Sequence, residues 1–207
     1  MSALFAELAA EARAWLGLEG IAVAAAVLYL VLAIREHRAC WYFAALSSAL
    51  YVYILFAARL YMESGLSVFY FAMAVYGWLS WTGGSSDAPL RVTRWPGHWH
   101  AAAIGVVTAM SLCSGFLLAA YTDAAFPYID SMTTWAALWA TFLVARKVLE
   151  NWWYWFVIDT VLVVMFSLRG LELTALLYVV YLVMIPFGYV NWRRSWRAAE
   201  GVTGERI

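Results

Sequence analysis

The residues best suited to chemistry lie in the stretch ENWWYWFVID, residues 150–159. On a helix, Trp152, Trp155 and Asp159 stand at positions i, i+3 and i+7, so two indoles and a carboxylate share one face. Asp159 falls about halfway along an apolar run, where an ionised carboxylate costs roughly 2.5 to 3.5 kcal/mol in a bilayer. We therefore expect it to face the protein interior. There it either lines a substrate cavity, attracting a cation or accepting a hydrogen bond, or it accepts hydrogen bonds from neighbouring helices and fixes their packing.

A second aromatic face lies in VFYFAMAVYGWLSW, residues 68–81. Tyr70, Gly77 and Trp81 recur there at spacings of seven and four, and Gly77 would let a helix or a ligand approach closely. Trp81 and Trp192 stand at the ends of apolar runs beside polar residues. This position predicts that both lie in the aromatic belt at headgroup level.

Patterns typical of metal sites or enzymes are missing from the sequence. His98 and His100 form a pair without a third ligand, which is typical of a solvated loop, so we predict no metal site. The chain contains no GxxxxGK[ST] or GxGxxG run and no HExxH grouping. We therefore predict no cofactor, no ATP coupling within this chain and no enzymatic activity. Cys40 and Cys113 lie in or beside apolar segments, where we expect packing rather than a disulfide.

The elements that must position these residues are membrane-spanning helices. Hydrophobic residues make up 66% of the 207 residues, charged residues only 13%, and the mean hydropathy is +0.76. A soluble domain has roughly 25% charged residues, so this composition predicts an all-α polytopic membrane protein. The predicted spans are residues 17–34, 41–58, 66–82, 100–121, 130–145, 152–168 and 172–192.

Basic residues are distributed unequally between alternate loops of this seven-helix topology. Ten lie on one side of the membrane and three, Arg13, Arg59 and Arg169, on the other. Because Lys and Arg collect on the cytoplasmic side, we predict an external N-terminus and a cytoplasmic C-terminus. The lipid bilayer is thus an expected partner, and nucleic acid is not.

Shifting the sequence by 111 residues aligns the first three spans with the last three without a gap. The aligned pairs are Arg35 with Arg146, Trp41 with Trp152, Leu60 with Leu171, Tyr70 with Tyr181, Met73 with Met184, Gly77 with Gly188, and Trp81 with Trp192. Two tryptophan pairs at the same 40-residue spacing are uncommon by chance, which favours a duplication. One extra span separates the halves, so both cross the membrane in the same direction.

This repeat predicts a 3+1+3 fold of the SWEET type, in which a central linker helix joins two parallel three-helix bundles that hold the substrate between them. The expected organisation is an N-terminal surface segment (1–16), a first bundle (17–82), the linker helix (100–121), a second bundle (130–192) and a cytoplasmic tail (193–207).

The sequence resembles the PnuC family of bacterial vitamin transporters. The matching stretches are YGWLSW at 76–81, PYIDSMTT at 127–134, ARKVLENWWYW at 145–155 and GLELTALLY at 170–178. The resemblance implies uptake of nicotinamide riboside for NAD salvage by facilitated diffusion through the bacterial inner membrane. It also implies alternating access, and trapping of the vitamin as its phosphate by a cytoplasmic kinase. Trp152 and Trp155 would stack on the ligand ring, which is a flat cation.

Taken together, the aromatic faces and the resemblance give one set of candidate substrate-binding residues. They are Trp152, Trp155, Asp159, Asn151, Ser67, Tyr70, Trp78 and Tyr178. Family members often have LLQ where this chain has Gly65, Leu66 and Ser67, and this departure bears on the substrate rather than the fold.

Several functions are compatible with these patterns. The leading one is a nicotinamide riboside uniporter. The runner-up is a transporter for thiamine, or another cationic-ring vitamin, on the same fold, favoured if Ser67 and Glu63 serve an aminopyrimidine. A receptor or assembly subunit that does not transport is a third, and an intramembrane enzyme ranks last. The protein could also form a homo-oligomer.

Overall fold

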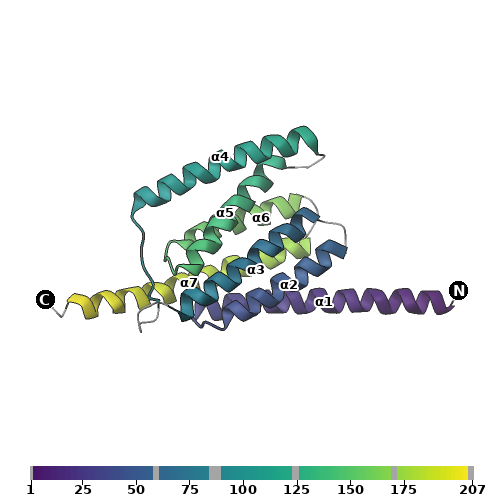
Figure 1. Cartoon of the computed structure of the whole chain (residues 1–207), viewed down its shortest axis with the longest axis horizontal. Coiled ribbons are helices and arrows are strands. Elements are labelled where there is room, and N and C mark those ends of the chain that lie inside the picture. The colour runs from purple at the N-terminus through teal and green to yellow at the C-terminus, as the bar shows by residue number, and fades with distance from the viewer. Residues whose placement is uncertain (1, 58–60, 84–89, 123–125, 169–171, 205–207) are drawn as a thin grey trace. The chain divides into compact units, whose positions relative to one another are not determined.

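The computed structural model describes residues 2–57, 61–83, 90–122, 126–168 and 172–204, with side chains described outside 2–16, 61–63, 172–174 and 201–204. Within these ranges the regular secondary structure is helical, apart from a single β-bridge between Thr93 and Val148. The helices are α1 (Ser2–Ile34), α2 (Cys40–Ala57), α3 (Tyr61–Thr82), α4 (Gly97–Tyr121), α5 (Pro127–Ala145), α6 (Asn151–Leu168) and α7 (Glu172–Gly204), as Figure 1 shows.

Each predicted span corresponds to one of these helices, although some helices are longer than predicted. The segment 1–16, predicted as a surface segment, is helical from Ser2 and continues into the first span as α1. The segment 193–207, predicted as a tail, continues α7 as far as Gly204. Both helices have 33 residues. At a rise of about 1.5 Å per residue each is about 50 Å long, which exceeds the roughly 30 Å hydrocarbon core of a bilayer.

Five described segments are long and apolar enough to cross a membrane. They are Gly17–Ile34, Cys40–Ala57, Gly97–Tyr121, Asn151–Leu168 and Ala175–Glu200. The helices α3 and α5 do not meet this criterion, so their predicted membrane crossing stays a prediction. The sequence of α5 includes Asp130 as well as Ser and Thr residues, of which Ser131, Thr133 and Thr141 are buried by neighbouring helices rather than facing lipid.

The chain forms two compact units, residues 1–89 and 90–207. In unit 1, α2 packs against both α1 and α3. In unit 2, α5 packs against α4 and α6, and α6 packs against α7. The helix predicted as a linker, α4, therefore groups with the second set of three helices. The 3+1+3 arrangement of the two bundles stays a prediction.

The same tryptophan–glycine packing holds the second and third helices of the repeat together in both units. In unit 1 the rings of Trp41 and Trp81 meet edge to face at 5.4 Å and 88°. In unit 2 the rings of Trp152 and Trp192 do so at 5.4 Å and 87°. A Cβ atom added to Gly77 would overlap the Trp41 ring, and one added to Gly188 would overlap the Trp152 ring.

This packing overturns one prediction. Trp81 is 7% exposed and Trp192 is fully buried, so neither lies in a lipid-facing aromatic belt. Polar neighbours at a span end suggested the belt, but the close approach allowed by a glycine four residues earlier gives each indole a partner inside its unit.

The turn between the first two helices of the repeat is also the same in both units. Glu36 and Lys147, which are 111 residues apart, have positive φ angles of 55° and 52°. In unit 1 the N–H groups of Glu36 and His37 bond to the carbonyls of Ala33 and Leu32 at 3.0 and 2.9 Å.

In unit 2 the N–H groups of Lys147 and Val148 bond to the carbonyls of Val144 and Leu143 at 3.0 and 2.9 Å. Both turns are Schellman motifs, in which a left-handed residue satisfies the last helical carbonyls. The repeat predicted from the sequence is thus present as matched local geometry.

Candidate functional site

Helix α6 carries the main candidate residues, and it begins with two buried polar groups that have unused hydrogen-bonding capacity. Asn151 is fully buried, and its Nδ2 donates to the carbonyl of Val148 at 2.6 Å. Within the described part of the chain, its Oδ1 atom and the Nε1 of Trp152 have no hydrogen-bond partner. Buried polar groups are nearly always paired, so an unpaired acceptor beside an unpaired donor is a feature that a bound ligand would explain.

Asp159 lies two turns further along α6 and is 3% exposed. Among the described residues, no side chain or backbone N–H donates a hydrogen bond to its carboxylate. The Thr141 and Thr160 hydroxyls donate to backbone carbonyls instead, so no hydrogen bond supports a packing role for Asp159. A carboxylate buried without a partner is costly, and a cationic ligand would remove that cost.

The two candidate indoles of α6 contact different helices. Trp152 is 3% exposed and packs against Trp192 and Gly188 of α7. Trp155 is half-buried and packs against the apolar cluster that Ala137 and Ala140 of α5 form with Ile158. The packing of Trp152 matches that of Trp41 in unit 1, whereas the position equivalent to Trp155 is Ala44. A tryptophan with this packing role is therefore found in both units, whereas a tryptophan at the position of Trp155 is found only in unit 2.

The remaining candidates lie on α3 and α7. Ser67 is buried, while Tyr70 and Trp78 are half-buried on α3, where Trp78 contacts Tyr42 of α2 at 6.1 Å between ring centroids. Tyr178 on α7 stacks on Phe166 of α6, with centroids 5.5 Å apart and planes 8° from parallel. These contacts show Trp78 and Tyr178 engaged with aromatic neighbours in their own units. The side chain of Glu63 is outside those described.

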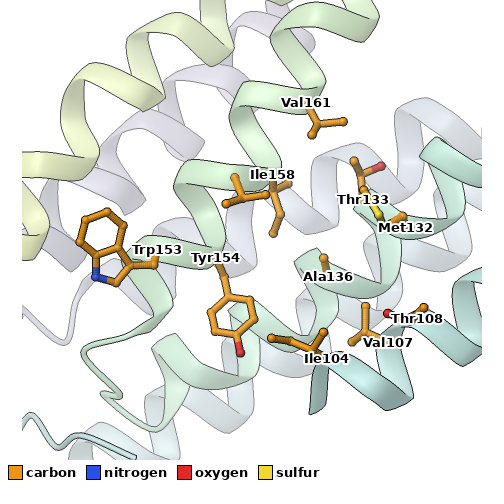
Figure 2. A pocket seen from close by; sticks show the side chains of 11 residues that line it. Ile104, Val107, Thr108, Met132, Thr133, Ala136, Trp153, Tyr154, Ile158 and Val161 are labelled. Carbon is orange, nitrogen blue, oxygen red and sulfur yellow. The ribbon is translucent and has the colours of Figure 1, made fainter. Parts of the chain in front are cut away.

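A cavity of about 330 Å³ lies over α5 between α4 and α6, and Figure 2 shows its lining. Its walls are mostly aliphatic, with Val107, Ala136 and Val157 among them, and none of the predicted site residues lines it. The Thr133 hydroxyl already donates to backbone carbonyls, and Tyr154 already bonds to His100. This lining suits an acyl chain rather than a polar riboside.

The structure also corrects two minor predictions. His100, predicted in a solvated loop, lies in α4 with its side chain 15% exposed, and its Nδ1 is 3.0 Å from the Tyr154 hydroxyl. Spacing along the chain gave no sign of this contact, because 54 residues separate the pair. Cys40 is buried as predicted, but Cys113 is exposed on α4, and neither cysteine is in a disulfide.

Comparisons with known proteins agree with this architecture. A family model described as nicotinamide mononucleotide transporter matches residues 16–194. The nicotinamide riboside transporter PnuC of Escherichia coli (strain K12) is 27% identical over 216 residues, covering 91% of this chain and 88% of that protein. The riboflavin/roseoflavin transporter RibM of Streptomyces davaonensis is 26% identical over 154 residues, covering 70% of each chain.

A solved structure has the same fold. The crystal structure of the vitamin B3 transporter PnuC superposes with a TM-score of 0.69 at 19% identity, covering 87% of this chain and 82% of that one. The family resemblance predicted from the ENW and YGW stretches is confirmed, and the relatives are transporters. This chain is therefore a multi-pass membrane protein of the nicotinamide mononucleotide transporter family, and a relative of the PnuC proteins.

Proposed function

We propose that this chain carries nicotinamide riboside across the bacterial inner membrane by facilitated diffusion with alternating access. The observation that carries the proposal is a set of buried polar groups on α6: the Asn151 Oδ1 and Trp152 Nε1 atoms, which lack a hydrogen-bond partner among the described residues, and the buried Asp159 carboxylate. A carboxylate attracts the pyridinium ring, and the Asn151 oxygen with the indole N–H matches a donor and an acceptor such as those of a carboxamide or a ribose. The names of the E. coli and vitamin B3 relatives agree with this substrate.

The architecture and orientation belong to the same proposal. The matched packing and turns support two equivalent three-helix bundles, with α4 as the connecting helix. The unequal distribution of Lys and Arg between alternate loops supports an external N-terminus and a cytoplasmic C-terminus. Because no ATP-binding motif drives uptake, a cytoplasmic kinase would trap the riboside as its phosphate and sustain NAD salvage.

Uptake into vesicles tests the proposal directly. We expect purified chain in kinase-free vesicles to equilibrate labelled nicotinamide riboside to equal concentrations inside and out, without ATP or an ion gradient. Preloading vesicles with unlabelled riboside should accelerate entry of the label by counterflow. Binding without counterflow would instead indicate a receptor, and accumulation above equilibrium would contradict facilitated diffusion.

Thiamine is the second candidate, because it too presents a flat cation to Asp159. Competition between nicotinamide riboside and thiamine for the same site should show a clear preference for one. Riboflavin, which the name of the RibM relative suggests, has a neutral ring and serves as the comparison for charge. We expect it to compete least, since it gains nothing from a buried carboxylate.

Two neighbouring indoles on α6 allow a matched test of ring stacking. We expect Trp155→Ala to weaken riboside binding by roughly 1 to 2 kcal/mol, or about 5- to 30-fold, because a cation would lose its stacking partner. Trp153 is 58% exposed and packs against Tyr189, so Trp153→Ala removes the same side chain with little expected effect on affinity. Isothermal titration of both purified variants measures the difference. Equal affinities would assign Trp155 to packing.

A further inference from the structure

The turn ahead of α6 is hydrogen-bonded to a segment that lies far from it in the sequence. Both turns form the same Schellman motif, with Lys147 in one and Glu36 in the other. In unit 2 the Thr93 N–H also donates to the Lys147 carbonyl at 3.0 Å, and the Leu149 N–H donates to the Thr93 carbonyl at 2.9 Å. The segment that leads into α4 is thereby bonded to the turn that leads into α6.

Glu150, the last residue before α6, completes this connection with both of its carboxylate oxygens. Its Oε1 accepts a hydrogen bond from Arg94 Nε at 2.8 Å, and its Oε2 accepts one from the Trp95 N–H at 3.3 Å. The Arg94 guanidinium also lies over the Trp196 ring of α7, 5.3 Å from its centroid. The hydrogen bond to Glu150 and the charge of that residue raise the pKa of Arg94. Glu150 thus links the start of α6 to the segment before α4 and, through Arg94, to the end of α7.

The first unit shows that the turn itself does not need this link. The position equivalent to Glu150 is Ala39, whose N–H donates to His37 Nδ1 at 3.3 Å within the same turn. The helix–turn–helix geometry is nevertheless the same. The contacts of Glu150 therefore exceed what folding of the turn requires, and they fix the end of the helix that carries Asn151, Trp155 and Asp159.

We propose that Glu150 is a positioning residue for the transport site, which holds the first two turns of α6 so that Asn151, Trp155 and Asp159 meet the ligand in a fixed geometry. The inference rests on the proposed function, because it assumes that those side chains contact a transported vitamin. Glu150 acts through Arg94 and Trp95 and does not itself touch the ligand.

The test combines hydrogen exchange with ligand binding in Glu150→Ala and Glu150→Gln. We expect Glu150→Ala to accelerate amide exchange in residues 147–156 by about tenfold, while residues 36–44 of unit 1 exchange as in the parent chain. The affinity for nicotinamide riboside should fall about tenfold, with folded yield retained. Glu150→Gln keeps one acceptor oxygen, so its exchange rate and its affinity should lie between those of Glu150→Ala and those of the parent chain. Arg94→Gln should resemble Glu150→Gln, whereas Arg91→Gln, at an exposed arginine three residues away, should resemble the parent chain.

The outcomes separate this inference from the proposed function. Unchanged exchange in residues 147–156 of Glu150→Ala would overturn the positioning role whatever the ligand is. Faster exchange with unchanged affinity would also overturn it, because α6 would then be loosened without consequence for the site. If the parent chain bound no nicotinamide riboside and no thiamine, the proposed function would fail, and the exchange experiment would still decide whether Glu150 fixes α6.

Discussion

Gly188→Ala is expected to destabilise the folded chain by about 1 to 3 kcal/mol, because a Cβ atom at this position overlaps the buried Trp152 ring. The ring cannot move aside easily, since Trp152 is 3% exposed and packs edge to face against Trp192. Thermal unfolding of the purified protein in detergent, followed by tryptophan fluorescence, measures the effect. Larger side chains such as Gly188→Leu should abolish the folded fraction.

A matched glycine-to-alanine substitution elsewhere in the chain should not destabilise the protein as Gly188→Ala does. A glycine in the middle of a helix costs about 1 kcal/mol relative to alanine, so Gly105→Ala, in α4 with open space around it, should be neutral or stabilising. Combining Gly188→Ala with Trp152→Leu should restore part of the stability that each single substitution removes. Equal melting temperatures for Gly188→Ala and Gly105→Ala would contradict the observed packing.

The repeat explains why so much of the fold could be predicted from the sequence. Apolar runs of about 20 residues predict membrane helices, and five of the seven predicted spans contain a segment long and apolar enough to cross a membrane. The 111-residue shift aligns Trp41 with Trp152 and Gly77 with Gly188. In the structure the tryptophan of each unit contacts the glycine of the same unit. A bulky ring facing a glycine is a strong constraint, so sequence register and packing coincide.

The candidate site was less predictable, because helical periodicity gives the side of a helix but not its neighbour. Trp152 and Trp155 are close on the helical wheel, yet one packs on α7 and the other on α5. Likewise, Glu150 bonds to Arg94, which lies 56 residues away in the sequence. Contacts between distant segments depend on tertiary packing, which a single sequence does not encode as spacing.

Asp159→Asn is expected to weaken binding of the cationic riboside by about 2 kcal/mol, or roughly 30-fold, while the shape of the side chain is kept. The carboxylate is buried and lacks a hydrogen-bond partner among the described residues, so a bound pyridinium would be its main compensation. Reduced nicotinamide riboside has nearly the same shape but a neutral ring, so Asp159→Asn should change its affinity little. The ratio of the two affinities therefore isolates the charge.

Folding provides the internal control for this substitution. If Asp159 mainly fixed helix packing, Asp159→Asn would change the melting temperature and would affect both forms of the riboside alike. If it faces the ligand, removing an uncompensated buried charge should leave the ligand-free protein as stable or more stable, because desolvation penalises the carboxylate more than the amide. Higher stability together with selective loss of cation binding is a combination that only a ligand-facing carboxylate produces.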